Sequence, residues 1–113
     1  MKLGLIGYGA IGKYVEAAHI EDVELVSILV KRPRNQGLVT HEPDRFFARK
    51  VDAVAECAGH EAVRAHGERV LESGADFLVT GDKPLLAVRR VGHAQIVSPH
   101  RFARLLFGSA RTG

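Results

Sequence analysis

Three glycines near the N-terminus have a spacing that suits the binding of phosphate groups. They form the pattern G-x-G-x-x-G directly after the apolar run 2–6 and at the start of a helical pattern. In this setting the first glycine permits a tight turn, the second lets a pyrophosphate approach the backbone, and the third lets the helix pack on the strand. The N-terminus of the helix then offers free N–H groups and a positive dipole. The pattern predicts a dinucleotide site formed by Gly7, Gly9, Ala10, Ile11 and Gly12, with a glycine turn that binds no ligand as the alternative.

The end of the second predicted strand bears on which dinucleotide is bound. NAD-specific sites usually place an acidic side chain about 20 residues beyond the motif, where it holds the ribose hydroxyls. The sequence has no acid between Glu24 and Glu42, and the basic residues Lys31, Arg32 and Arg34 follow the strand instead. Their charges can pair with a 2′-phosphate. The sequence therefore favours NADP over NAD, and the alternative is that these are solvated loop charges.

A second candidate segment ends the third long apolar run. Cys57, Ala58 and Gly59 are expected at the carboxyl edge of the sheet, near the nicotinamide, where small residues allow close approach of a ring. Because no basic partner for a thiolate is evident, a packing role for Cys57 is favoured over a nucleophilic one. His60 is either a proton carrier or a residue that packs at a helix start. The six histidines show no metal-ligand spacing, so no metal is assigned.

Apolar runs and helical patterns alternate along the first 80 residues. The runs that predict strands are 2–6, 23–30, 51–58 and 75–80, with a weak edge strand at 38–40. The patterns that predict helices are 10–19, 42–50 and 60–73. Such alternation indicates a parallel sheet with right-handed crossovers. We therefore expect a single Rossmann-like α/β domain, a doubly wound parallel sheet with a strand order near 3-2-1-4-5.

The last third of the chain differs in charge from the rest. Residues 1–82 contain 10 Lys and Arg against 13 Asp and Glu, whereas residues 83–113 contain 6 Lys and Arg and no acid. A helix at 84–91, a strand at 94–98 and a frayed end at 109–113 are the expectations there. We expect a dinucleotide-binding Rossmann core over 1–81 and a divergent basic segment of the same domain over 82–113, either truncated or partly disordered.

Composition narrows the class of protein. A chain of 113 residues that is 46% hydrophobic can form one domain with its own core. One cysteine excludes an intramolecular disulfide framework and is typical of a reducing cytoplasm. No apolar run approaches the ~20 residues that span a bilayer, and glycine follows the N-terminus too soon for a signal peptide. The basic tail lacks the dense clusters typical of nucleic-acid contact, which is therefore disfavoured.

Three segments of the chain resemble the N-terminal domain of L-aspartate dehydrogenases, which is similar to the cofactor domain of homoserine dehydrogenases. They are GLIGYGAIGKYV at 4–15, ELVSILVKR at 24–32 and VDAVAECAGHEAVRAHGERVLESGADFLV at 51–79. The resemblance covers residues 2–80, and it extends well beyond a bare dinucleotide fingerprint. It implies NAD(P)-dependent oxidative deamination of L-aspartate to iminosuccinate.

The resemblance also implies roles for individual residues. Residues 7–12 would bind the pyrophosphate, and Lys31 and Arg32 would lie at the adenosine ribose. Cys57, Ala58 and Gly59, together with Thr80 and Gly81, would line the nicotinamide side.

The sequence departs from this family after the last clear strand. Gly81-Asp82-Lys83-Pro84-Leu85 replaces the usual Ser-Val-Gly-Ala-Leu-like turn. Family members continue into a second α+β domain, which holds the substrate, a catalytic histidine and the dimer contacts. We expect no counterpart of that domain here and regard the tail as a truncated or frame-altered end. Catalytic residues are therefore unassigned, and L-aspartate is expected as a partner only if a second domain or subunit is supplied. Whether the chain forms a homodimer is left open by the sequence.

Two other functions remain open. The first is a non-catalytic NAD(P)-binding module. The second comes from Asp82-Lys83-Pro84, which resembles the Glu-Lys-Pro motif of glucose-fructose oxidoreductase-like dehydrogenases, whose lysine assists proton transfer. Here the lysine stands about two residues later than that motif requires, so a proline at a helix start beside a surface lysine is the simpler interpretation.

Overall fold

The computed structural model describes residues 1–7, 23–33 and 35–111. The helix predicted at 10–19 lies outside the described residues, as do Gly9, Ala10, Ile11 and Gly12 of the glycine motif. Within the described part of the chain, no helix is long and apolar enough to cross a membrane.

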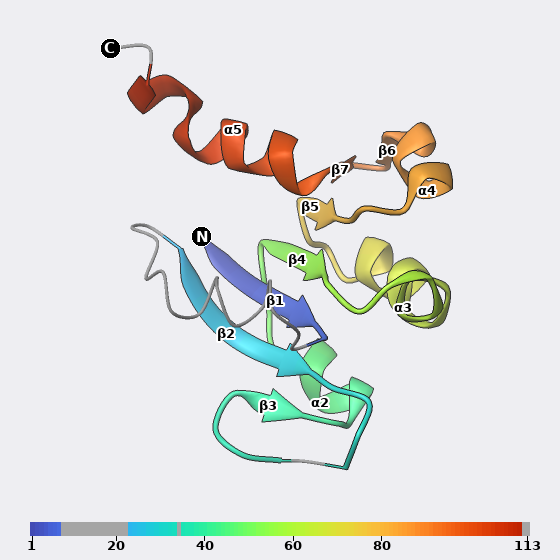
Figure 1. Ribbon diagram of the computed structural model, residues 1–113. Coiled ribbons are helices and arrows are strands. Elements are labelled where there is room, and N and C mark those ends of the chain that lie inside the picture. The colour runs from blue at the N-terminus through green and yellow to red at the C-terminus, as the bar shows by residue number, and fades with distance from the viewer. Residues whose placement is uncertain (8–22, 34, 112–113) are drawn as a thin grey trace.

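A seven-stranded sheet organises the described residues (Figure 1). In spatial order its strands are β3 (Val39–Thr40), β2 (Glu24–Leu29), β1 (Lys2–Ile6), β4 (Ala53–Glu56), β5 (Phe77–Val79), β7 (Ala94–Val97) and β6 (Arg90–Val91). Neighbouring strands pair in parallel except β6 and β7, which are antiparallel. The predicted order 3-2-1-4-5 is confirmed, and β7 and β6 extend it.

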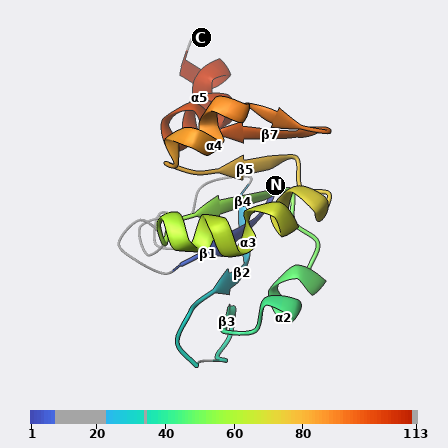
Figure 2. The ribbon, with the colours of Figure 1, turned by 90° about the vertical axis from the view of Figure 1, so that its right-hand side faces the viewer.

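Helices lie on both faces of the sheet, so the doubly wound Rossmann-like architecture is confirmed. They are α2 (Pro43–Ala48), α3 (His60–Glu72), α4 (Lys83–Val88) and α5 (Pro99–Arg111). In Figure 2 the helices α2, α3 and α4 lie in front of the strands. Because all the described strands belong to one sheet and the described helices pack on it, the expectation of one domain is also confirmed.

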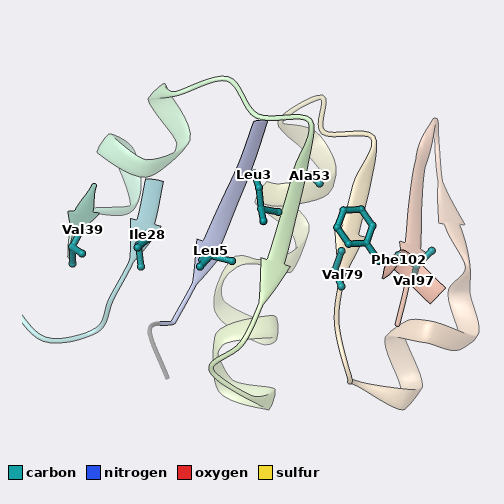
Figure 3. Close-up of a cluster of buried hydrophobic side chains, with 8 residues drawn as sticks. All are labelled: Leu3, Leu5, Ile28, Val39, Ala53, Val79, Val97 and Phe102. Atoms are coloured by element: carbon teal, nitrogen blue, oxygen red, sulfur yellow. The ribbon is translucent and has the colours of Figure 1, made fainter. Parts of the chain in front are cut away.

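Alternation of side chains along the strands divides the core into two clusters, one on each face. One cluster joins residues from six strands to Phe102 of α5; its members are Leu3, Leu5, Ile28, Val39, Ala53, Val79, Val97 and Phe102 (Figure 3). The other joins strand residues to Phe46 of α2 and Val70 of α3; its members are Ile6, Leu29, Phe46, Val54, Val70, Leu78 and Ile96. Residues adjacent in sequence, such as Leu78 and Val79, therefore serve opposite faces.

Close approach of α2 to the sheet depends on a glycine in β1. A Cβ atom at Gly4 would lie 2.8 Å from Cζ of Phe46, inside any tolerable contact distance. The Phe46 ring is 1% exposed and packs edge-on against Phe47, with ring centroids 5.0 Å apart. Gly4 thus leaves the space that this aromatic ring fills.

The C-terminal region corrects two predictions. The helix expected over 84–91 ends at Val88, because Arg89 adopts φ 69°, and Arg90–Val91 forms a strand instead. Gly92, with φ 60°, and His93 make the two-residue turn that pairs β6 with β7. The frayed end expected over 109–113 is wrong for residues 109–111, which complete α5. The strand expected at 94–98 corresponds to β7.

Asp82-Lys83-Pro84 has a local structural explanation. The Asp82 carboxylate accepts a hydrogen bond from the backbone N–H of Leu85 at 3.0 Å and so caps α4, and Pro84 lies in the first turn. Lys83 is exposed at the start of this helix. The triplet therefore acts as a helix start.

Candidate functional site

A cavity of about 450 Å³ lies where β1, β2 and β4 end; we call it the strand-end cavity. The strand ends contribute Ile6, Gly7, Leu29, Val30 and Lys31. The loop before α3 contributes Ala58, and α3 itself contributes Glu61, Ala62, Ala65 and His66. His41 comes from the segment before α2, and Pro43 is the first residue of that helix. Ligands of open α/β proteins bind at this carboxyl edge of the sheet, so the cavity has the expected position for one.

Gly7 makes the sharp turn at the bottom of this cavity. It has φ 95°, and its N–H donates to the Leu29 carbonyl at 2.7 Å. A Cβ atom there would lie 2.7 Å from the Cβ of Ala58 and 3.0 Å from its backbone nitrogen. Both the backbone angle and the contact with the end of β4 therefore require glycine.

The connection from β4 to α3 is held by an internal carboxylate. Oε1 of Glu56 accepts hydrogen bonds from the N–H groups of Ala58 at 2.6 Å and Gly59 at 2.7 Å. Gly59 is the N-cap residue of α3. Glu56 thus fixes the loop that carries Ala58 into the cavity wall.

Two opposite charges meet at the mouth of the cavity. Nζ of Lys31, after β2, lies 3.6 Å from Oε2 of Glu61 in the first turn of α3, and both side chains are 93% exposed. Arg32 follows and is also exposed. Since water screens such a pair strongly, the Lys31 ammonium can exchange Glu61 for an anionic ligand at small cost.

His66 supplies the cavity with an uncharged imidazole. Burial, and secondarily the positive charge of Arg69, lower the pKa of His66 below its usual 6.5. Its ring is tilted against Phe47, with centroids 6.4 Å apart, and the Arg69 guanidinium lies 4.5 Å over the Phe47 ring. At neutral pH the neutral ring can donate one hydrogen bond and accept another.

Cys57 does not have the surroundings of a nucleophile. Burial, followed by the negative charge of Glu56, raises the pKa of the Cys57 thiol above its usual value of 9.0. The side chain is half-buried and packs against the cluster that contains Leu5 and Phe102. The thiol therefore stays protonated at neutral pH.

Thr80 and Gly81 follow β5 at the same edge of the sheet. Thr80 is fully buried, and its hydroxyl accepts a hydrogen bond from the backbone N–H of Asp82 at 3.1 Å. Gly81 is exposed. This hydrogen bond shows that the Thr80 side chain stabilises the turn that leads to α4.

The structure brings together some of the residues singled out from the sequence. Gly7, Lys31 and Ala58 line the strand-end cavity. Five others lie outside its lining, namely Arg32, Cys57, Gly59, Thr80 and Gly81. The sequence analysis did not identify five lining residues, namely His41, Glu61, Ala62, Ala65 and His66. The last four share a predicted helix that begins at the strand end, and their helical spacing was an available signal.

The sheet order, the helices on both faces and the cavity at the glycine turn define a Rossmann-like α/β protein. Among solved structures, RSP, a Rex-family repressor, is similar with a TM-score of 0.67 and 15% identity, over 98% of this chain and 58% of that chain. RSP in complex with beta-NADH gives a TM-score of 0.66 and 16% identity, over 98% and 59% of the two chains. At these identities the likeness concerns the fold alone.

Two proteins of known function are similar to this chain in sequence over its N-terminal part. L-aspartate dehydrogenase of Archaeoglobus fulgidus is 38% identical over 80 residues, which are 70% of this chain and 34% of the relative. L-aspartate dehydrogenase of Ruegeria pomeroyi is 31% identical over 85 residues, covering 69% and 30% of the two proteins. The predicted resemblance of the N-terminal part is therefore confirmed, and the chain spans about a third of the length of these relatives. No protein-family model matches the sequence.

Proposed function

We propose that this chain is a nicotinamide-dinucleotide-binding domain whose cofactor occupies the strand-end cavity. The observation that carries the proposal is the Gly7 turn, which ends β1 beside the cavity and begins the motif G-x-G-x-x-G. Gly9, Ala10, Ile11 and Gly12 would complete the phosphate cradle. The name of the relatives and the NADH bound by RSP support the same cofactor class.

We further propose a preference for NADP over NAD. The end of β2 carries Lys31 and Arg32 and no acidic side chain, and Lys31 lines the cavity. A 2′-phosphate bound there would gain a charge-assisted hydrogen bond, whereas a ribose hydroxyl would find no carboxylate at the end of β2 to accept its hydrogen bond. Cys57, Gly59, Thr80 and Gly81 would then border the nicotinamide end, and Arg32 the adenosine end.

Oxidation of L-aspartate is proposed only for an assembly that adds a substrate-binding part. Among the residues that the structure describes, the titratable groups in the cavity lining are Lys31, His41, Glu61 and His66. A cofactor domain binds and orients the dinucleotide, and the groups that hold the substrate come from elsewhere. Residues 1–81 would supply the cofactor site and 82–113 would complete the sheet, in a cytoplasmic protein that binds cofactor without turnover on its own.

A fluorescence titration of the purified chain with NADPH and with NADH tests the proposal. We expect saturable binding of both, tighter for NADPH, and no oxidation of NADPH or reduction of NADP when L-aspartate or oxaloacetate with ammonia is added. Absence of saturable binding of either dinucleotide would refute the proposed function.

A valine at the second motif glycine provides an internal check. Gly9→Val should abolish binding, because the added side chain would fill the space that the pyrophosphate needs. Ala87→Val adds similar bulk on the exposed side of α4 and should leave the affinity unchanged. Unchanged affinity in Gly9→Val would contradict the proposed cradle.

The NADP preference has its own test. Arg32→Glu should weaken NADPH more than NADH, because the new carboxylate repels the 2′-phosphate and can accept hydrogen bonds from ribose hydroxyls. Arg101→Glu, on α5, makes the same change of net charge away from the cavity. Equal losses for the two dinucleotides would count against a role in 2′-phosphate recognition.

A further inference from the structure

A second, smaller cavity of about 240 Å³ lies at the edge of the sheet beside β3; we call it the edge cavity. Its outer wall is the turn 35–38 and β3, and its inner wall is formed by Ser27 of β2 with Arg45 and Arg49 of the α2 segment. The lining of the edge cavity and that of the strand-end cavity share no residue.

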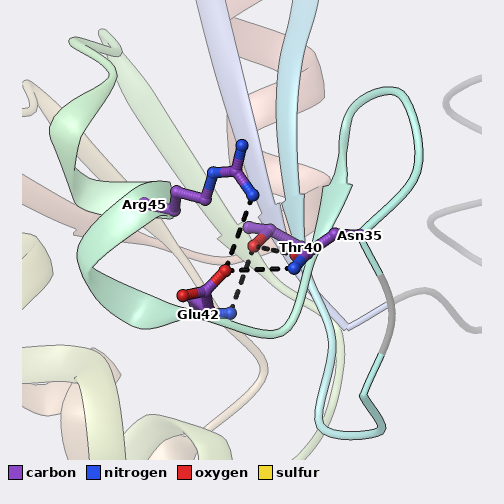
Figure 4. A network of polar contacts seen from close by, with 4 residues as sticks. All are labelled: Asn35, Thr40, Glu42 and Arg45. Atoms are coloured by element: carbon purple, nitrogen blue, oxygen red, sulfur yellow. Dashed lines mark hydrogen bonds and ion pairs between the residues drawn. The ribbon is translucent and has the colours of Figure 1, made fainter.

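Asn35 and Thr40, which line the edge cavity, are paired with each other and with Glu42 (Figure 4). The Thr40 hydroxyl donates to Oδ1 of Asn35 at 2.7 Å and accepts from the N–H of Glu42 at 3.1 Å. Nδ2 of Asn35 donates to Oε2 of Glu42 at 3.0 Å. This closed network fixes the wall and leaves Asn35 and Thr40 little capacity for a ligand.

Two guanidinium groups, which only donate hydrogen bonds, also line the edge cavity. Arg49 uses one guanidinium nitrogen to bond the Val26 carbonyl at 2.8 Å, and Arg45 has one nitrogen 3.5 Å from Oε2 of Glu42. Each guanidinium has five N–H donors, so most of them remain. Ser27 is 2% exposed and lines the cavity, and its hydroxyl is a further group that can donate.

The charges of the two arginines also favour an anion. Arg45 lies in α2 and Arg49, four residues later, is the C-cap residue of that helix, a spacing at which like charges repel each other. Among the described ion pairs, the Glu42 carboxylate contacts Arg45 and not Arg49. A bound oxyanion would accept from both guanidinium groups and from the Ser27 hydroxyl, relieving this repulsion.

We propose that the edge cavity is a binding site for a small oxyanion, of the phosphate or carboxylate type, that is separate from the strand-end cavity. Because Arg45 is largely exposed, water and salt weaken the attraction, and we expect a dissociation constant on the order of a millimolar. We expect the site to prefer an oxyanion over chloride, because a planar guanidinium group can donate two parallel hydrogen bonds to an oxyanion.

The test follows backbone amide chemical shifts of the whole chain while inorganic phosphate is added at constant ionic strength with chloride. Saturable shifts of Gly37, Leu38 and Thr40 are expected. A parallel titration with acetate separates the two chemistries: a response to phosphate alone assigns a phosphate site, and a comparable response to both assigns a carboxylate-tolerant one. Shifts that do not saturate, or that centre on Gly7 and Ala58, would overturn the proposal.

Substitutions then tie the response to the cavity. Arg45→Gln and Ser27→Ala should each weaken phosphate binding, by about tenfold for the charged group. Arg64→Gln removes an equal charge from an exposed position on α3 and should leave binding unchanged. Equal weakening by Arg45→Gln and Arg64→Gln would show a non-specific charge effect and refute the site.

Discussion

The region up to β5 and the region after it belong to the same sheet, but their residues have different roles. Residues 1–80 supply every residue that lines the two cavities described above. Residues 82–111 supply apolar contacts, chiefly Ala94, Ile96 and Val97 of β7 and Phe102 of α5. Extension of the sheet thus needs only alternating apolar side chains, whereas the cavities need particular residues.

Charge separates the two regions in the same way. Up to position 82, Asp and Glu outnumber Lys and Arg by 13 to 10. After that position, Lys and Arg occur but no Asp or Glu. In the described part of the first region, Lys31, Arg45 and Arg69 each have a carboxylate partner within 4.0 Å. The second region is held mainly by apolar burial, and its described contact with a carboxylate is that of His93 with Asp76 at 3.5 Å. The sheet therefore continues beyond residue 80, where the sequence likeness to dehydrogenases ends.

The largest expected effect is that of Phe46→Ala, which tests whether the first region depends on its packing. The ring fills the space left by Gly4 between α2 and the sheet, so its removal leaves a void. We expect the free energy of unfolding to fall by about 3–5 kcal/mol. Urea unfolding followed by circular dichroism measures this. Val88→Ala, at an exposed position, should change it by less than about 0.5 kcal/mol, and similar values for both variants would contradict the packing.

Phe102→Ala makes the equivalent change in the second region. Phe102 is 8% exposed and stacks at a tilt on Phe77, with centroids 5.6 Å apart. We expect a loss of about 3 kcal/mol in the free energy of unfolding, the lower end for a buried Phe→Ala change because the ring keeps some exposure, with dinucleotide affinity of the folded protein unchanged within about twofold. A loss of affinity as large as that of Gly9→Val would show that the two regions are not functionally separable.

The sequence allowed the first region to be predicted more fully than the second. Strands such as 2–6 and 75–80 are compact apolar runs bounded by glycine, so local pattern and tertiary role agree. The strand Arg90–Val91 is too short to show alternation, and only its hairpin with Ala94 creates it. The helix α5 was not foreseen, although its Phe102 anchors it to the sheet.

The same contrast holds within the strand-end cavity. Gly7 and Ala58 could be predicted because a glycine motif and a strand end mark the edge of a parallel sheet. Glu61 and His66 lie on one helix with small residues between them, and only the packing of α3 shows that they reach the cavity. His41 comes from a loop whose path depends on β3.

A smaller effect is expected at Cys57, which lies at the end of β4 but faces the cluster shared with α5. Cys57→Ala should lower the free energy of unfolding by about 1 kcal/mol and leave dinucleotide affinity unchanged. In the parent chain the raised pKa of the thiol predicts slow alkylation by iodoacetamide at neutral pH. Stability should fall above pH 9.0, where the unfolded state ionises first. Fast alkylation at neutral pH, measured by mass, would contradict the packing role.

The smallest expected effect is at Glu61, and it tests how the charges of the first region act on the proposed cofactor. Glu61 holds the Lys31 ammonium across the mouth of the cavity, so a bound 2′-phosphate would have to compete with it. Glu61→Gln removes the competitor, and we expect NADPH affinity to rise by roughly threefold, with less change for NADH and a smaller gain at high salt. Glu68→Gln removes the same charge from α3 outside the cavity lining and should change neither affinity. Fluorescence titrations of both variants at two ionic strengths measure this difference. Equal gains in the two variants would mean that net charge alone acts, whereas a gain confined to Glu61→Gln would mean that this ion pair sets part of the selectivity between the two dinucleotides.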